Sequence, residues 1–433
     1  MITQKVYIND LEGRIDPHFY QLFFKTLENR LQKLTYKKLG DIVSLSSETW
    51  NQKDQFEDKF PYIEISEIDI LSGEINNITY QDKKEAPSRA KMIVRENDII
   101  VSTTRPHRGA IAQIDKEKDG FIASTGFAIL RKLKTQDILK SYLYYFLRTN
   151  LALNQLLQRS SGGNYPAITS EELQKLIIPT PSIDIQNKII LIMQSAYKNR
   201  KEKLKQADEL LNPIDSYVFD KLGIKMSEIK DKMCFVIDSE EIKIGRIDPN
   251  NFLYPQDTPS SNKFKEMKLS EVANFSKGQS ITSKEIVSGD YHVVAGGQIS
   301  PYTINKFNHK GDVITVSASG AYSGYVWYHE EPIFASDCTV IKTLDKDTNL
   351  TFYLYCVMKA KQKFIYNMQQ GAGQPHVYSR DLSNLKIPLP SLHIQNKIVK
   401  EVKLRTQKAE GLQEEAKEEL EKAKKKVEEM ILN

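Results

Sequence analysis

The last 43 residues of the chain carry one apolar stripe at helical spacing. Successive stripe residues lie three or four positions apart, and Glu and Lys fill most of the remaining positions. This period predicts an amphipathic helix from Ser391 to the C-terminus, with Ser391 as its N-cap. The stripe consists of Ile398, Val402, Arg405, Ala409, Leu412, Ala416, Leu420, Ala423, Val427 and Met430.

A second stripe of this kind runs from about Ser182 to Ile229. Arg200 interrupts it, and Asn212-Pro213 predicts the end of one helix and the first turn of the next. A helix with a single apolar stripe needs a partner that covers the stripe. We expect the two helices to pack antiparallel within the chain, and the alternative is pairing between chains. The central stripe consists of Ile189, Met193, Ala196, Leu204, Ala207, Leu211, Ile214 and Val218.

Short apolar runs ahead of each helix predict mixed strand and helix structure. The runs occur in the same order in both regions, and a Gly-containing loop follows the strand in each. The corresponding segments are 98–102 and 312–317 for the strands, 103–114 and 318–329 for the loops, and 142–147 and 352–357 for the helices.

These elements belong to a sequence repeat. Residues 162–189 return as residues 371–398, and Gly13-Arg-Ile-Asp-Pro returns at Gly245. The regions between these motifs barely match, and their lengths differ: Pro17 to Pro179 spans 162 residues, whereas Pro249 to Pro388 spans 139. The repeat therefore predicts one scaffold that carries two different variable regions. The shared positions include Pro166, Pro179, Pro181, Gln186, Asn187 and Lys188, which fall on Pro375, Pro388, Pro390, Gln395, Asn396 and Lys397.

The predicted fold is α+β, with two mixed α/β domains joined by two long antiparallel, coiled-coil-like helices. The N-terminal Val-Tyr-Ile-Asn-Asp resembles Cys-Phe-Val-Ile-Asp ahead of the second Gly-Arg-Ile-Asp-Pro. We therefore expect the N-terminal arm to complete a cyclic repeat with a pseudo-two-fold axis. The predicted boundaries are 1–30 for the arm, 31–181 for the first domain, 182–232 for the central helical region, 233–390 for the second domain and 391–433 for the C-terminal helix.

Composition adds constraints on compartment and partners. The chain has 433 residues, 40% of them hydrophobic and 27% charged, which is typical of globular proteins of two or three domains. Its net charge of +5 permits a polyanionic partner without requiring one. The three cysteines, Cys234, Cys338 and Cys356, form no disulfide framework or zinc motif. We find no signal peptide and no apolar stretch of membrane-spanning length, so we expect a cytoplasmic protein without a membrane partner.

Known catalytic motifs are missing from the sequence. It contains no GxxxxGK[ST] phosphate loop, no HExxH, no GxSxG and no Asn-Pro-Pro-Tyr-type methyltransferase motif. No two of the seven histidines lie four residues apart on a predicted helix. We therefore predict no catalytic residues and no metal site. A recognition protein is favoured over an enzyme, although an enzyme with an unrecognised site stays open.

Each variable region is closed by the motif I-P-x-P-S-x-x-x-Q-x-K-I, at Ile178–Ile189 and at Ile387–Ile398, and a long amphipathic helix follows each. Either motif alone is weak evidence. Two motifs at this spacing, with helices behind both, make the chain resemble the specificity subunit of a Type I restriction–modification system over essentially its whole length.

The resemblance implies a non-catalytic DNA-binding subunit. In that family each variable region is a target recognition domain for one half of a split, asymmetric site in double-stranded DNA. The helices separate the domains and dock two modification subunits, which bind S-adenosylmethionine and methylate adenine at N6, and restriction subunits complete the endonuclease. The chain itself would bind no cofactor. Two rivals remain: a specificity subunit for a fused nuclease–methyltransferase, and a coiled-coil scaffold with two domains for ligands other than DNA.

Candidate DNA-binding residues follow from loop positions and side-chain chemistry. Arginine can donate two hydrogen bonds to guanine, and glutamine can pair with adenine, although either side chain can also be merely exposed. In the first domain, basic residues near the strand are expected on phosphates, and the two Gly-containing loops on bases. The candidates are Arg89, Lys91, Arg95, Arg105, His107, Arg108, Ser161, Asn164 and Tyr165 in the first domain, and Lys277, Gln279, Gln298, Ser319, Tyr322, Ser323, Gln374 and His376 in the second.

Overall fold

The computed structural model describes residues 13–51, 56–224, 263–282, 285–371 and 373–433. The chain divides into two compact units. Unit 1 comprises Met1–Lys203 and Glu414–Asn433, and unit 2 comprises Leu204–Gln413. The Val-Tyr-Ile-Asn-Asp segment, Cys234 and the second Gly-Arg-Ile-Asp-Pro motif lie outside the described residues.

Both predicted amphipathic helical regions are present, but the central one ends at Leu222, before Gly223, rather than near Ile229. They are α6 (Ile183–Leu211), α7 (Ile214–Leu222) and α14 (Leu392–Leu432). The break between α6 and α7 falls at Asn212-Pro213, because proline lacks the N–H that would continue the helix. Most stripe residues are buried, but Arg405 is only half-buried and lies over the ring of Tyr217 at 4.8 Å.

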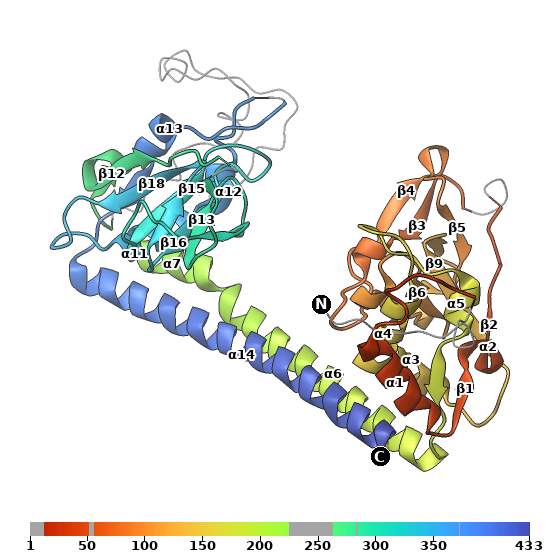
Figure 1. Cartoon of the computed structure of the whole chain (residues 1–433). Helices are drawn as coiled ribbons and strands as arrows, with labels where there is room; N and C mark the ends of the chain where they lie inside the picture. Colours follow the sequence, from red (N-terminus) through yellow and green to blue (C-terminus); the bar gives the residue numbers. More distant parts are fainter. Residues whose placement is uncertain (1–12, 52–55, 225–262, 283–284, 372) are drawn as a thin grey trace. The chain divides into compact units, whose positions relative to one another are not determined.

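The helices pack antiparallel within the chain, as their single stripes predict. In unit 1, Lys203 of α6 pairs with Glu415 of α14 at 2.6 Å, and Asn199 donates to Glu419, so the two helices run in opposite directions (Figure 1). In unit 2, the buried residues Val218 and Leu222 of α7 share a cluster with Ile398 and Val402 of α14.

The described residues of unit 1 form three sheets, in the orders β2-β9-β6-β7, β4-β3-β8-β5 and β1-β10. Within the second sheet β3 runs parallel to β8, and the other neighbouring pairs are antiparallel. The elements are α1 (Leu22–Gln32), β1 (Tyr36–Lys38), α2 (Leu39–Ile42), β2 (Val43–Leu45), β3 (Lys59–Ile63), β4 (Thr79–Asp82), β5 (Ala90–Ile93), β6 (Ile99–Ser102), β7 (Ile111–Gln113), β8 (Ile122–Ser124), β9 (Phe127–Leu133), α3 (Lys140–Leu147), α4 (Asn150–Arg159), α5 (Ser170–Gln174) and β10 (Ile177–Pro179).

Unit 2 contains the sheets β12-β18-β15-β16, β14-β13-β17 and β11-β19. Here β13 runs parallel to β17, as β3 does to β8 in unit 1. The elements are β11 (Glu266–Lys268), α10 (Leu269–Val272), β12 (Ala273–Lys277), β13 (Tyr291–Val294), β14 (Thr303–Ile304), β15 (Val313–Ser317), β16 (Val326–His329), β17 (Ile333–Ala335), β18 (Cys338–Thr343), α11 (Thr351–Ala360), α12 (Gln362–Tyr366), α13 (Ser379–Ser383) and β19 (Lys386–Pro388).

The two units therefore share one topology, and the prediction of a duplicated body is confirmed. Sheet β2-β9-β6-β7 corresponds strand for strand to β12-β18-β15-β16, and β1-β10 corresponds to β11-β19. The predicted strands and helices at 98–102, 312–317, 142–147 and 352–357 appear as β6, β15, α3 and α11. The edge strand β5 has no counterpart among the described residues of unit 2, which accounts for part of the extra length of the first region.

The repeated closing motif has a structural role in both units. The buried side chain of Gln186 accepts from the N–H of Leu139 at 2.9 Å and donates to the carbonyls of Asp137 and Pro181. Gln395 makes the corresponding bonds to Leu350, Thr348 and Pro390. Each glutamine thus fixes the start of its long helix against the loop that leads into α3 or α11.

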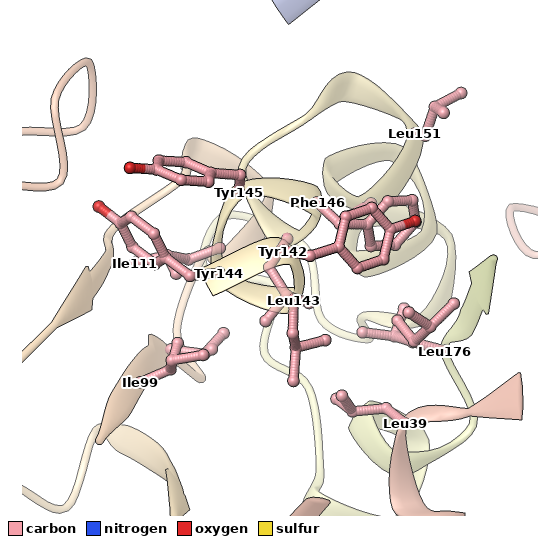
Figure 2. Close-up of a cluster of buried hydrophobic side chains, with 14 of the residues drawn as sticks. Leu39, Ile99, Ile111, Tyr142, Leu143, Tyr144, Tyr145, Phe146, Leu151 and Leu176 are labelled. Carbon is pink, nitrogen blue, oxygen red and sulfur yellow. The ribbon is translucent and has the colours of Figure 1, made fainter. Parts of the chain in front are cut away.

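The core of unit 1 is built around α3. Its largest cluster joins this helix to the sheet β2-β9-β6-β7 and to α4, α6 and α14. Figure 2 shows Tyr142, Leu143 and Phe146 within this cluster. Tyr142 keeps its hydroxyl satisfied by donating to the carbonyl of Pro179 at 2.9 Å, and Tyr353 donates to Pro388 in unit 2. Through these bonds, α3 holds the closing motif of unit 1 and α11 holds that of unit 2.

Candidate nucleic-acid interface

Loops from separate parts of unit 1 meet where β6 ends. The N–H of Thr103 donates to the carbonyl of Gly126 at 2.7 Å, and the N–H of Thr125 donates to Arg89 at 2.8 Å. Arg105 donates its N–H to the carbonyl of Pro166 at 2.6 Å. These bonds join residues 103–108, 124–126 and 161–167 and the backbone of Arg89 into one surface, which we call the unit 1 loop surface.

The half-buried Arg105 and the exposed Tyr165 form a stacked pair on this surface. The guanidinium carbon of Arg105 lies 4.1 Å from the ring centroid of Tyr165, whose side chain is 70% exposed. Its Nε and Nη2 donate to the carbonyl of Asn164 at 3.2 and 2.8 Å. Stacking and hydrogen bonding together restrict the side chain, so the cation is held in place before any ligand arrives.

The backbone of Arg105 is strained. Its φ is 48°, in the left-handed region, where a residue with a Cβ costs about 1 kcal/mol or more relative to glycine. Strained residues of this kind are found where surrounding structure fixes them, often at functional sites.

The other candidates of unit 1 differ in their environments. His107 is half-buried in the short turn Pro106–Arg108, and burial lowers its pKa. Its buried Nδ1 has no hydrogen-bond partner among the described residues, so it is less accessible than the sequence suggests. Arg108 and Lys91 are exposed, whereas Arg95 forms an ion pair with Glu48. Ser161 pairs with Ala167 through its backbone, next to Asn164 and Tyr165.

Unit 2 has a corresponding loop surface at the end of β15. The N–H of Ala318 donates to the carbonyl of Asp337 at 3.1 Å, and that of Gly320 donates to Pro375 at 3.0 Å. The N–H of Gly278 donates to Cys338 at 2.9 Å, which brings residues 277–279 to the same place. We call residues 277–279, 318–323, 336–338 and 370–376, without residue 372, the unit 2 loop surface.

Several candidates lie on or beside the unit 2 loop surface. Ser319 donates its hydroxyl hydrogen to a carboxylate oxygen of Asp337. The amide of Gln298 donates to the hydroxyl of Tyr366 at 3.3 Å, and the ring of His376 stacks near that of Tyr378 at 6.0 Å. Tyr322 is 49% exposed, whereas Ser323 is buried. Lys277, Gln279 and Gln374 are exposed.

Three further residues on or beside this surface were not among the predicted candidates. Asp337 precedes β18, and Tyr366 and Tyr378 flank the Gly-rich loop. None of them is at a position whose residue is shared between the two copies of the repeat. Asp337 reaches the surface only because its backbone carbonyl binds Ala318, a contact that the sequence does not encode locally.

The family model for the Type I restriction modification DNA specificity domain matches residues 16–211 and 261–422. The chain belongs to this family. The first match contains the unit 1 loop surface and the second contains the unit 2 loop surface, so each surface belongs to one target recognition domain of a Type I specificity subunit.

Relatives and solved structures agree with this assignment. The MjaVIII specificity subunit of Methanocaldococcus jannaschii is 24% identical over 405 residues, which are 88% of this chain and 86% of that protein. The HindI specificity subunit of Haemophilus influenzae is 21% identical over 48% of this chain and 46% of its own length, so the chain spans about half of that relative. The crystal structure of a Type I S subunit from M. genitalium, 18% identical, covers 92% of this chain and 95% of its own with a TM-score of 0.50, and supports the fold.

The specificity subunit also carries a groove on the paired helices of each unit. In unit 1 a groove of about 450 Å³ lies between Leu191–Ala196 of α6 and Glu419–Lys426 of α14. In unit 2 a groove of about 420 Å³ lies between α7 and residues 394–404 of α14. The two copies of the repeat are offset by 209 residues, so Ser195 in the first groove aligns with Leu404 in the second. The grooves therefore occupy corresponding surfaces of the two units. Each exposes a leucine, Leu191 at 65% and Leu404 at 58%.

The described residues hold no metal cluster and no membrane-spanning helix. Within the described ranges, no group of three or more His, Cys, Asp or Glu side chains is arranged to hold a metal ion. None of the helices in that part of the chain is long and apolar enough to cross a membrane.

Proposed function

We propose that the two recognition domains of this specificity subunit each bind one half of a bipartite, asymmetric site in double-stranded DNA. The observation that carries the proposal is the pairing of one topology with two unlike loop surfaces. If both surfaces bound the same sequence, a duplicated scaffold would have no reason to present different side chains at corresponding places. The net charge of +5 favours association with a polyanion.

The paired helices are proposed to dock two modification subunits. The corresponding grooves support this idea, because two copies of one partner need two similar surfaces. Those subunits would bind S-adenosylmethionine and methylate adenine at N6, and restriction subunits would join through them. In this scheme the specificity subunit supplies recognition and geometry, has no catalytic residues and binds no cofactor.

The helices are also proposed to set the distance between the half-sites. The helix α14 contributes residues to both units without interruption, and an α-helix of 41 residues is about 60 Å long. A rigid connection of this kind would fix the number of unread base pairs, whereas a flexible linker would permit several.

The direct test is co-expression of the chain with Type I modification subunits from the same organism, followed by sequencing of methylated adenines. We expect one motif with two different half-sites and a fixed gap, and no methylation when the chain is left out. A continuous motif, identical half-sites, or methylation independent of the chain would contradict the proposal. Co-purification would distinguish separate modification subunits from a fused nuclease–methyltransferase.

A further inference from the structure

The two loop surfaces present different side chains at corresponding positions of the same backbone framework. Arg105 and Gly320 correspond, since each donates its N–H to the proline carbonyl of the Gly-rich loop and each has a left-handed φ, 48° and 86°. Gly126 and Asp337 correspond in the same way, since each accepts from the residue that follows β6 or β15. Unit 1 thus has arginine at the first position and glycine at the second, whereas unit 2 has glycine at the first and aspartate at the second.

At the first position, the backbone favours glycine and unit 2 has glycine. Unit 1 keeps an arginine there in spite of the strain. The bonds to Asn164 use Nε and one hydrogen of Nη2. Among the described residues no acceptor takes the Nη1 hydrogens or the second Nη2 hydrogen of Arg105, and these form the end of the guanidinium that matches O6 and N7 of guanine.

At the second position, the exposed carboxylate of Asp337 is unsuited to a phosphate, because the two charges repel each other. The bond from Ser319 occupies only part of its acceptor capacity. In the major groove, a carboxylate is complementary to the N4 amino group of cytosine. Adenine fits less well, since its N7 acceptor lies beside the amino group and would face the carboxylate.

We infer that Arg105 contacts a guanine in one half-site and that Asp337 contacts the cytosine of a G·C pair in the other. This inference rests on the proposed function, because it assumes that both loop surfaces bind DNA. The units then use one framework to present a donor in one domain and an acceptor in the other. Tyr165 is a positioning residue that holds the guanidinium of Arg105.

The first experiment compares methylated motifs of the full complex with the wild-type chain, Arg105→Gly and Asp337→Asn. Arg105→Gly should lose the requirement for one G·C pair in one half-site, and Asp337→Asn should lose it in the other half-site. Discrimination against the wrong base pair should fall by about 5- to 150-fold at that position alone. Arg105→Gly should leave thermal stability unchanged or raise it, because glycine suits the left-handed backbone.

The methylated motif alone does not show whether a residue contacts the guanine or the cytosine of a G·C pair, because the two bases always occur together. The second experiment therefore measures binding of the complex to duplexes with 7-deazaguanine, which lacks N7, or 2-pyrimidinone, which lacks the N4 amino group. The first analogue should weaken wild-type binding in the Arg105 half-site but have no added effect on Arg105→Gly. The second analogue should weaken wild-type binding in the Asp337 half-site but have no added effect on Asp337→Asn.

Matched controls are Asn97→Gly and Asp347→Asn. Asn97 is a left-handed residue, with φ of 66°, at the start of β6, opposite to the end that bears Arg105. Asp347 is exposed beyond the far end of β18 from Asp337. Both controls should keep the wild-type motif.

The outcomes separate the inference from the proposed function. If the wild-type complex yields no bipartite motif, the proposed function fails. If it yields one and the two variants keep it, relax the same half-site, or stay sensitive to the analogues, the inference is wrong and the proposed function stands.

Discussion

Unit 1 and unit 2 share a set of buried hydrogen bonds and differ in the side chains of their loop surfaces. Both keep a glutamine that closes onto the loop before α3 or α11, and both keep a tyrosine bonded to the closing Pro-x-Pro. Their loop surfaces share backbone hydrogen bonds but not side chains. These repeated buried hydrogen bonds hold the shared scaffold together. The exposed loops can therefore change their side chains without loss of the fold.

The largest expected effect concerns the helices that belong to both units. We predict that inserting four residues after Leu204 in α6, matched by four after Gln413 in α14, lengthens the unread gap by about 2 base pairs. One helical turn adds about 6 Å, and base pairs are stacked about 3.4 Å apart. Sequencing of methylated sites should show loss of nearly all original sites. An unchanged gap would mean that the helices do not set it.

The next expected effect concerns a cationic side chain that differs between the two units. Arg148 in unit 1 is 2% exposed and donates to four backbone carbonyls and to Tyr197. Its counterpart Lys359 donates to Val326 and Gln362. We predict that Arg148→Met destabilises unit 1 by about 3 kcal/mol or more, because several buried carbonyls lose their partner.

Lys359→Met is the matched variant and should cost unit 2 about 1 kcal/mol. Hydrogen exchange of amides in α3 and α11 reports the two units separately. Equal losses of protection would show that the extra bonds of Arg148 contribute nothing.

A pH-dependent difference comes third. His329 is buried in unit 2 and bonded to Thr315 at 2.8 Å, and burial lowers its pKa to about 4. The unfolded chain takes up a proton below about pH 6.5, whereas the folded ring stays neutral. Stability from this site is therefore complete above pH 6.5 and falls as the pH drops toward 4, by about 3 kcal/mol at most.

Unit 1 has the buried residues Ile100 and Ile114 at the corresponding positions. The double variant Thr315→Ile/His329→Ile transfers this apolar pair to unit 2. In this variant, the hydrogen-exchange protection of unit 2 should fall less between pH 6.5 and pH 4 than it does in the wild type. A decline as steep as in the wild type would assign the effect to other groups.

The last effect should be equal in the two units. We predict that Gln186→Ala and Gln395→Ala each cost about 2 kcal/mol, since each leaves a buried N–H and two carbonyls without their partner. Denaturant-dependent hydrogen exchange would measure both. A large loss in only one unit would mean that the repeated motif has diverged in role.

Sequence reasoning succeeded best for the elements with a regular period. The helix from Leu392, the break at Asn212-Pro213 and the strand pair β6 and β15 all lie where the apolar pattern places them. The candidate loops of each domain also meet in space. Individual side chains were harder: His107 is partly buried, Arg95 is in an ion pair, and Asp337 was missed.

The sequence by itself determined the duplication, the amphipathic helices and the loops that vary, because period and repetition are local properties of a chain. Only the tertiary structure decided that Arg105 stacks on Tyr165, that Gly126 and Asp337 occupy corresponding places, and that Arg148 is buried. These facts depend on hydrogen bonds between residues far apart in the chain. Such bonds form only when the sheets bring the loops together, and no short stretch of sequence contains both partners.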